Sequence, residues 1–167
     1  LGRYDSQRVR FLNGQDVPDE MEAGEKMLAE MLQNAAHCRR EAISMENLVV
    51  GLKCGGSDGF SGITANPLLG AFSDTLAAQG GALLLTEVPE MFGAETLLLN
   101  RCEDEAIFAQ AAKLMDDFKS YFTRHGQNIY EKPSPGNKAG GITTLEEKSL
   151  GCVQKSGRTA VRDVLLY

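Results

Sequence analysis

A glycine-rich segment at residues 54–62 carries the residue types in this chain that are best suited to chemistry. It reads Cys-Gly-Gly-Ser-Asp-Gly-Phe-Ser-Gly, with four glycines in nine residues. Glycines let backbone N–H groups approach an anionic ligand closely, and the amino end of a following helix adds a favourable dipole. The spacing matches neither a P-loop nor a dinucleotide-binding fingerprint. The segment therefore predicts a site for a carboxylate or phosphate, with a plain strand-to-helix turn as the alternative.

The side chains of this segment offer a thiol, hydroxyls and a carboxylate. Cys54 could be a thiolate whose pKa is lowered by the amino end of the following helix, or a small buried hydrophobic residue. Asp58 could bind a divalent metal or act as a base, although a loop aspartate often forms an Asx turn. Ser57 and Ser61 supply the hydroxyls. Such crowding of polar groups favours a functional site.

Acidic and basic residues outside this segment extend the candidate site. Glu87 and Glu90 form a pair whose repulsion would raise one pKa, or they are solvated loop charges. Lys138 is the only cation in a second glycine-rich segment, at residues 133–141, where it could bind a substrate carboxylate or extend into water. The histidines and acidic residues show no zinc-like spacing. Metal ligands are thus not identified, with Cys54, Asp58 and Glu87 as possible members.

The elements around the first segment predict a parallel crossover. A continuous apolar run at 47–52 is typical of a strand covered on both faces. A helix follows, with Asn66 as its cap and Pro67 at its first position, and a second buried strand covers 82–86. Ligands collect at the carboxyl ends of parallel strands. We therefore expect the cysteine-containing segment and the two glutamates to face one crevice.

The rest of the pattern completes an α/β prediction. The fold class expected is a three-layer-like domain with a mainly parallel sheet flanked by helices. One domain is expected over 1–167, with a leading helical segment at 1–45 and a core at 46–167. The remaining expected elements are an amphipathic helix at 16–40, a helix at 103–124, an ordered loop or lid at 127–141, a short helix from Thr143 or Thr144 to Gly151 and a final strand at 159–166.

Composition and charge exclude several partners. The chain has 167 residues and a formal net charge of −6, which disfavours binding to nucleic acid. No apolar run is long enough to cross a bilayer, and the start of the chain lacks the core of a signal peptide. The four cysteines are widely spaced and are expected to be reduced. These features predict a cytoplasmic protein that acts on a small molecule.

Two motifs resemble signatures of the altronate/galactarate dehydratase family. The first is Cys-Gly-Gly-Ser-Asp-Gly-Phe-Ser-Gly-Ile-Thr-Ala-Asn-Pro at 54–67. The second is Pro-Ser-Pro-Gly-Asn-Lys-Ala-Gly-Gly at 133–141, which continues into Leu-Glu-Glu-Lys-Ser-Leu-Gly at 145–151. The resemblance covers the chain from about residue 47 onward, and the segments at 87–95 and 143–148 are similar to the altronate branch. Members of the family are much longer, so this chain resembles a fragment.

The resemblance implies a hydro-lyase of hexuronate catabolism that removes water from D-altronate, giving 2-keto-3-deoxy-D-gluconate. It implies a divalent metal, iron(II) or manganese, that assists removal of the C2 proton and loss of the C3 hydroxyl. The remaining domains of the parent chain would then be partners, a homo-oligomer is possible, and the fragment alone is expected to be inactive. The expected catalytic residues are Asp58, Glu87 and Cys54, and the expected substrate-binding residues are Ser57, Ser61, Thr64, Asn137 and Lys138.

Three other functions fit the same residues. The substrate could be galactarate or another 2-hydroxy acid, including sulfolactate. The chain could instead be a noncatalytic domain whose two glycine-rich segments bind a small anion. Finally, the Met/Leu stripe of the 16–40 helix could mark a structural or oligomerisation module, although such a stripe is usually core.

Overall fold

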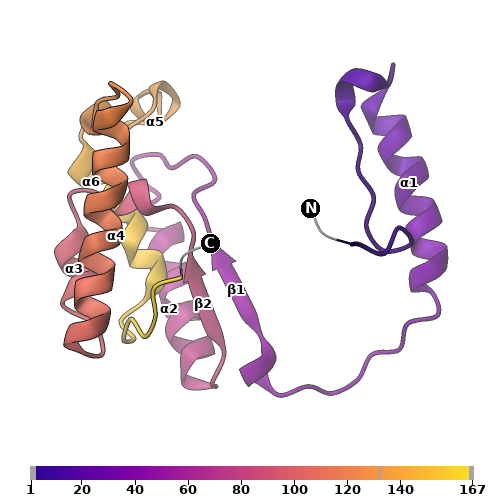
Figure 1. Cartoon of the computed structure of the whole chain (residues 1–167), viewed down its shortest axis with the longest axis horizontal. Coiled ribbons are helices and arrows are strands. Elements are labelled where there is room, and N and C mark those ends of the chain that lie inside the picture. Colours follow the sequence, from indigo (N-terminus) through magenta and orange to yellow (C-terminus); the bar gives the residue numbers. More distant parts are fainter. Residues whose placement is uncertain (1–2, 132, 166–167) are drawn as a thin grey trace. The chain divides into compact units, whose positions relative to one another are not determined.

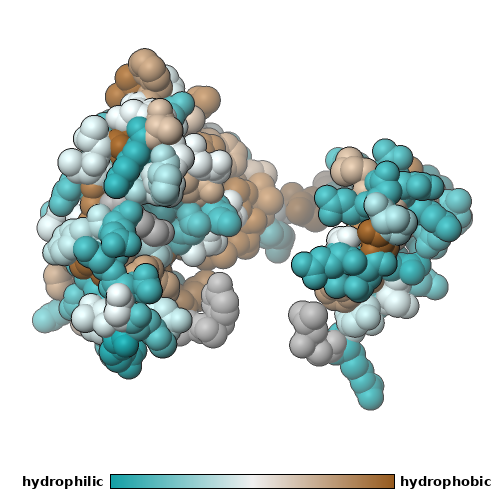
Figure 2. All heavy atoms as spheres, turned by 90° about the horizontal axis from the view of Figure 1, so that it is seen from above, coloured by the Kyte–Doolittle hydropathy of each residue, from teal (hydrophilic) through white to brown (hydrophobic). Residues whose placement is uncertain are grey.

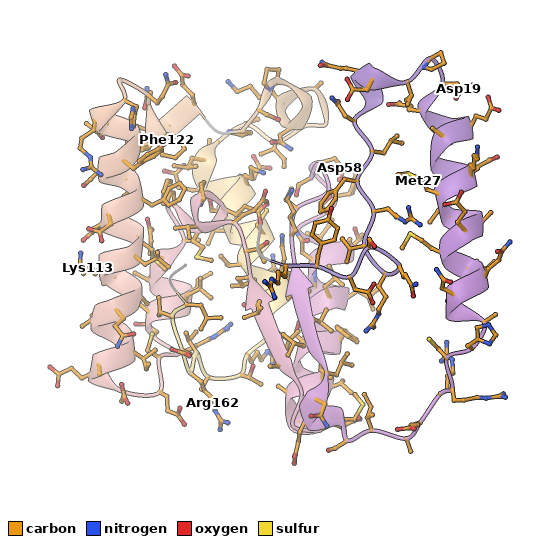
Figure 3. The ribbon with its side chains drawn as sticks, turned by 45° about the vertical axis from the view of Figure 1, so that its right-hand side comes forward. Asp19, Met27, Asp58, Lys113, Phe122 and Arg162 are labelled. Carbon is orange, nitrogen blue, oxygen red and sulfur yellow. The ribbon has the colours of Figure 1, made fainter. Side chains whose placement is uncertain are left out.

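The computed structural model describes residues 3–131 and 133–165, and the chain divides into two compact units, Leu1–Ile43 and Ser44–Tyr167. The first unit contains helix α1, Glu20–Ala35. Asp19 caps it by accepting hydrogen bonds from the backbone N–H groups of Met21 and Glu22, so the helix starts later than the 16–40 pattern predicted (Figure 3). Within the described part of this helix no residue is buried, although Met27 is half-buried.

The second unit is built on two parallel strands joined by a helix (Figure 1). Strand β1 is Val49–Leu52, β2 is Ala82–Leu85, and helix α2, Ala65–Ala78, lies between them in the chain. The register pairs Val49 with Ala82 and Leu52 with Leu85. The predicted parallel crossover and the small α/β fold are therefore confirmed.

Neither strand is covered on both faces, which corrects the prediction from their apolar runs. Exposed and covered residues alternate along β1 and β2, and Val49 and Leu84 lie on the open face. The described residues form only two strands, so no second layer covers that face. Hydrophobic side chains consequently remain on the surface of this unit (Figure 2).

Helix α2 begins at a different residue from the one predicted. Its N-cap is Thr64, which makes no side-chain cap bond, and Asn66 lies inside the first turn with its side chain buried. The prediction of Asn66 as the cap and Pro67 as the first helical residue is therefore wrong by about two positions. The helix is followed by a glycine pair, in which Gly80 adopts a positive φ of 89°.

The remaining helices pack into one core beside the sheet. This core contains the buried residues Met91, Ala94, Leu98, Met115 and Val153. These residues come from η3 (Val88–Met91), from α3 (Glu95–Leu99) and its N-cap, from α4 (Glu105–Arg124) and from α6 (Leu145–Val153). The other helical elements after β2 are η4 (Ile129–Glu131), α5 (Pro135–Ala139) and η5 (Gln154–Ser156).

Sequence predictions for this region were partly right. Helix α4 ends at Arg124 as predicted, with Gly126 at a positive φ. The predicted loop at 127–141 contains the short helices η4 and α5. The predicted strand at 159–166 is wrong over its described residues, because Val161 forms only one isolated bridge, to Cys102. Residue 166 lies outside the described residues.

No helix in the described part of the chain is both long enough and apolar enough to cross a membrane.

Candidate functional site

The two glycine-rich segments meet in space, as the sequence predicted. Asn137 Nδ2 donates a hydrogen bond to the backbone oxygen of Ser57 at 2.8 Å, across 80 positions of sequence. Nearby, the backbone N–H of Gly59 donates to the carbonyl of Gly140 at 2.8 Å. Ser134 and Asn137 form a capping box at the start of α5, in which Ser134 donates hydrogen bonds to the Asn137 side-chain oxygen. The second segment is thereby fixed against the first.

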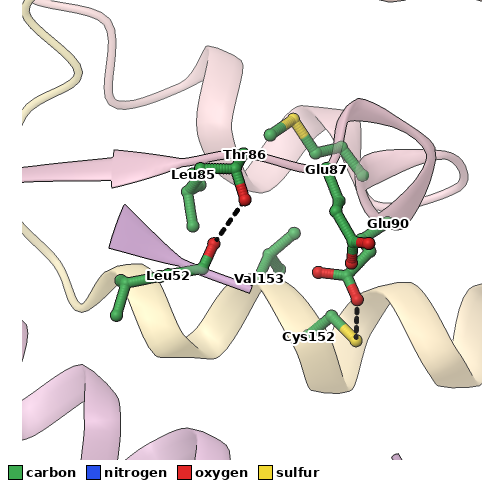
Figure 4. A pocket seen from close by; sticks show the side chains of 8 residues that line it. Leu52, Leu85, Thr86, Glu87, Glu90, Cys152 and Val153 are labelled. Atoms are coloured by element: carbon green, nitrogen blue, oxygen red, sulfur yellow. Dashed lines mark hydrogen bonds between the residues drawn. The ribbon is translucent and has the colours of Figure 1, made fainter. Parts of the chain in front are cut away.

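A cluster of thiols, a carboxylate and ammonium groups lies beside these segments, and we refer to Cys54, Glu90, Cys152, Lys148 and Lys155 as the thiol–lysine cluster. Ligand atoms of the first three all lie within 4.8 Å of one another. Cys152 Sγ is 3.7 Å from Glu90 Oε1, the contact drawn in Figure 4. Lys155 Nζ is 2.9 Å from Glu90 Oε2, and Lys148 Nζ is 3.7 Å from Cys54 Sγ.

The loop after one strand and three helical elements supply this cluster. Cys54 follows the carboxyl end of β1, and Glu90 lies in η3, just beyond β2. Helix α6 and the following η5 contribute the other members at positions 148, 152 and 155, which share one face of a continuous helical run. The cluster therefore lies at the sheet edge where parallel strands place their ligands.

Lys155 makes the largest contribution to keeping the buried carboxylate charged. Burial by itself would raise the pKa of Glu90, but the hydrogen bond and the positive charge of Lys155 outweigh burial, so this pKa lies below its ordinary value. Neither alternative considered from the sequence describes Glu90, because its pKa is not raised by Glu87 and its side chain is buried rather than solvated. Glu90 is an anion held by Lys155, with Lys148 3.9 Å from its other oxygen.

The two thiols of the cluster differ in acidity. Burial would raise the pKa of Cys54, but hydrogen bonds from the Ser57 hydroxyl and from the backbone N–H groups of Gly56 and Ser57 lower it overall. The lowering arises within the loop, whereas the sequence suggested the amino end of the helix. Burial raises the pKa of the Cys152 thiol. The Ser57 hydroxyl lies between them, 3.2 Å from Cys54 Sγ and 3.6 Å from Cys152 Sγ.

Asp58 forms an Asx turn, the alternative considered from the sequence. Its Oδ1 accepts hydrogen bonds from the Ser61 hydroxyl and from the backbone N–H groups of Ser61 and Phe60. These bonds, with the Ser61 hydroxyl first, lower the pKa of Asp58. Asp58 is exposed and lies outside the thiol–lysine cluster.

The other predicted residues are distributed around the cluster rather than within it. Glu87 accepts a hydrogen bond from the backbone N–H of Cys54 at 3.3 Å and lies 3.9 Å from Lys53. Thr64 donates its hydroxyl proton to the Phe60 carbonyl. Lys138 is exposed. Their functional roles stay predictions, because none of these contacts involves a ligand.

Sequence reasoning missed Cys152, Lys148 and Lys155 as site residues and treated Glu90 only as the neighbour of Glu87. A signal for the first three was present. Positions 148, 152 and 155 follow helical spacing, yet they carry polar or ionisable groups where a core-facing stripe would be apolar. A buried lysine needs a paired anion, and such a stripe predicts an acidic partner.

A groove of about 250 Å³ lies between the first glycine-rich segment and α6. Its wall includes Lys148, a member of the thiol–lysine cluster, and Asn66, whose Nδ2 is buried without a hydrogen-bond partner among the described residues. An unpaired buried donor is costly unless a ligand or water accepts from it. The groove therefore offers a buried hydrogen-bond donor and one ammonium group to a small polar ligand. Its polar lining residues are Ser57, Asp58, Asn66, Glu147, Lys148 and Gln154.

Comparisons with known proteins agree with these features. The family model for the C-terminal region of D-galactarate/altronate dehydratase matches residues 45–167. The chain is 62% identical over 160 residues to altronate dehydratase of Bacillus subtilis, which covers 96% of this chain and 32% of the relative. It is 56% identical over 167 residues to altronate dehydratase of Escherichia coli, covering all of this chain and 34% of the relative.

A more distant relative lies in the second branch of the family. Galactarate dehydratase (L-threo-forming) of Escherichia coli is 38% identical over 149 residues, 89% of this chain and 28% of that protein. The chain thus spans about a third of the length of the relatives that it matches. Because the family model covers most of the chain, this chain belongs to the D-galactarate/altronate dehydratase family, in its C-terminal region.

Proposed function

We propose that this chain is the part of a sugar-acid hydro-lyase that binds the acid end of its substrate and assists removal of the C2 proton. The proposed reaction converts D-altronate to 2-keto-3-deoxy-D-gluconate. The observation that carries the proposal is the meeting of the two glycine-rich segments beside a groove that Lys148 shares with the thiol–lysine cluster. The altronate dehydratases named above favour D-altronate as the substrate.

The chemistry requires a base and a strong positive field. A proton next to a carboxylate is weakly acidic, and its removal creates an enediolate with two negative charges. Lys148 is buried at the border of the groove, so its charge acts with little screening by water. Asn66 Nδ2 would donate to a substrate oxygen, and Ser57 would contribute a hydroxyl. A general acid must then protonate the departing C3 hydroxyl.

A divalent metal, iron(II) or manganese, completes this proposal. The donor set that fits a cation is Cys54, Glu90 and Cys152, whose ligand atoms already lie close together. Asp58 fits less well, because its Oδ1 is engaged by three donors of its own turn. When bound, the metal would polarise the substrate carboxylate and so make the C2 proton more acidic.

Asp58 and Glu87 remain the proposed candidates for the base. The lowered pKa of Asp58 makes its carboxylate a weak proton acceptor, which favours a role in shaping the loop. Glu87 contacts the backbone of Cys54 and lines a small cavity together with Glu90 and Cys152. We therefore assign the base to Glu87 in preference to Asp58.

Kinetics of the full-length enzyme test this assignment. Glu87→Gln should lower kcat by at least about 100-fold, since general base catalysis contributes roughly 10²–10⁴-fold. Asp58→Asn should have a smaller effect, and the exposed Asp117→Asn on α4 is the matched control. If both the Glu87 and Asp58 variants keep kcat within tenfold of wild type, neither residue is the base.

Substrate comparison tests the reaction itself. The full-length enzyme should release a 2-keto-3-deoxy acid from D-altronate faster than from galactarate or sulfolactate, whereas a noncatalytic anion-binding domain would bind these acids without product. The 167-residue chain alone should lack activity, because the remaining domains of the parent chain are expected to supply part of the site.

A further inference from the structure

We propose that Cys54, Glu90 and Cys152 are the protein ligands of one divalent cation and that this site selects a thiolate-binding metal, such as iron(II) or zinc, over manganese. The inference rests on the proposed function only for the reaction that the ion would serve. The ligand set and the metal preference follow from the thiol–lysine cluster itself.

The geometry of the three groups is close to that of a filled site. Metal–sulfur bonds of about 2.3 Å and metal–oxygen bonds of about 2.1 Å in a tetrahedron place sulfur and oxygen ligands about 3.6 Å apart. Cys152 Sγ and Glu90 Oε1 are 3.7 Å apart. The third ligand atom, Cys54 Sγ, lies within 4.8 Å of both, so a small side-chain rotation would complete the set.

Three protein ligands leave one coordination position open. Catalytic metal sites commonly use three protein ligands and reserve the fourth position for water or substrate, whereas structural sites fill all four. Cys54 is only half-buried, while Glu90 and Cys152 are buried. The open position would therefore lie on the Cys54 side, where Ser57 and Lys148 connect the cluster to the groove.

The surroundings already orient the ligands. Lys155 holds Glu90 Oε2 at 2.9 Å, which leaves Oε1 directed toward the thiols. The Ser57 hydroxyl contacts both sulfur atoms. In protein metal sites, hydrogen bonds to the ligating side chains commonly hold those side chains in the orientation that the metal requires. The two nearby ammonium groups do not forbid a cation, because an ion that displaces both thiol protons leaves the net charge of the cluster unchanged.

The donor atoms set the metal preference. Thiolates are soft ligands that bind iron(II), cobalt(II) and zinc well, whereas manganese prefers carboxylate and water oxygens. A site with two sulfurs and one oxygen should therefore discriminate against manganese. Of the two metals implied by the family resemblance, this site favours iron(II).

Cobalt(II) absorption tests the site without any turnover. Titration of the reduced, metal-free chain should give one cobalt per chain, with intense sulfur-to-cobalt charge-transfer bands. Cys54→Ser and Cys152→Ser should each lower this absorption by about half, because one of the two thiolates remains, the double variant should remove it, and Glu90→Gln should weaken cobalt binding by roughly 10–100-fold. The matched controls are Cys38→Ser and Cys102→Ser, which should leave the spectrum unchanged. Excess zinc should displace cobalt and abolish the bands, whereas manganese at the same concentration should leave them unchanged.

Thiol protection provides a second measurement on the unmodified chain, in case a variant fails to fold. Saturating zinc should slow alkylation of Cys54 and Cys152 at least tenfold, measured by mass spectrometry, and leave Cys38 and Cys102 unaffected. The site is refuted if charge-transfer bands survive in the Cys54→Ser/Cys152→Ser double variant, or if zinc protects neither thiol. Neither readout needs substrate, so failure of the metal site is distinguishable from failure of the proposed dehydration.

Discussion

Replacing Asn137 by alanine removes the side chain that joins the two glycine-rich segments. Its Nδ2 donates to the Ser57 carbonyl at 2.8 Å, and its Oδ1 accepts from the Ser134 N–H at 3.0 Å and from the Ser134 hydroxyl at 2.9 Å. Each such bond contributes about 1 kcal/mol net. Because Asn137 is buried, the partners left behind are poorly hydrated. We therefore expect the free energy of unfolding to fall by about 3 kcal/mol.

Urea unfolding followed by circular dichroism measures this loss, and two further variants locate it. Asn137→Asp keeps the acceptor for Ser134 but turns an oxygen toward the Ser57 carbonyl in a buried place, so it should cost at least as much as the alanine variant. Asn128→Ala is the matched control, because its exposed side chain caps only the Tyr130 N–H and should cost under about 1 kcal/mol. A loss below about 0.5 kcal/mol for Asn137→Ala would refute the role of this contact in holding the segments together.

Two other perturbations concern stability alone. Burial would raise the pKa of Glu95, but bonding to Lys119 and to backbone N–H groups lowers it, so its contribution to stability is present above the unfolded pKa of about 4.3 and is lost as pH falls through the folded value. The difference in unfolding free energy between wild type and Glu95→Gln should therefore shrink below about pH 4.3; a constant difference from pH 3 to pH 7 contradicts this. Gly70→Ala should cost roughly 1–3 kcal/mol in urea unfolding, because its Cβ would overlap the Gln154 carbonyl. Gly24→Ala on α1, which meets only an ordinary van der Waals contact, should instead stabilise by about 0.5–1 kcal/mol, and equal effects of the two changes would refute the packing explanation.

The local elements were predictable where end signals and periodicity agreed. The capping motif at 143–147 gave the start of α6, because Thr144 accepts from the Glu147 N–H and Glu147 binds back to Thr143. The Asn66–Pro67 pair gave the wrong start for α2, because Asn66 is buried by tertiary packing and the N-cap is Thr64. Apolar runs gave the two strands but not their exposure, which depends on what packs against each face.

The site was only half predictable for a related reason. The carboxyl-edge rule for parallel strands placed Cys54 and Glu90 in one region, because both follow strand ends closely in sequence. Lys155 and Cys152 reach that region through the packing of α6 and η5, which no local pattern encodes. Lys155 is 65 positions from Glu90, and only the fold reveals that its charge reverses the pKa shift expected from the glutamate pair.

The late position of the two lysines in the chain has a consequence for biosynthesis. Glu90 leaves the ribosome well before Lys148 and Lys155, so the nascent chain at that point lacks the two ammonium groups that pair with this carboxylate in the folded chain. The strand–helix–strand portion must therefore keep Glu90 hydrated, and its surroundings open, until the final helix has been made. Closure of the thiol–lysine cluster therefore has to follow the synthesis of α6 and η5.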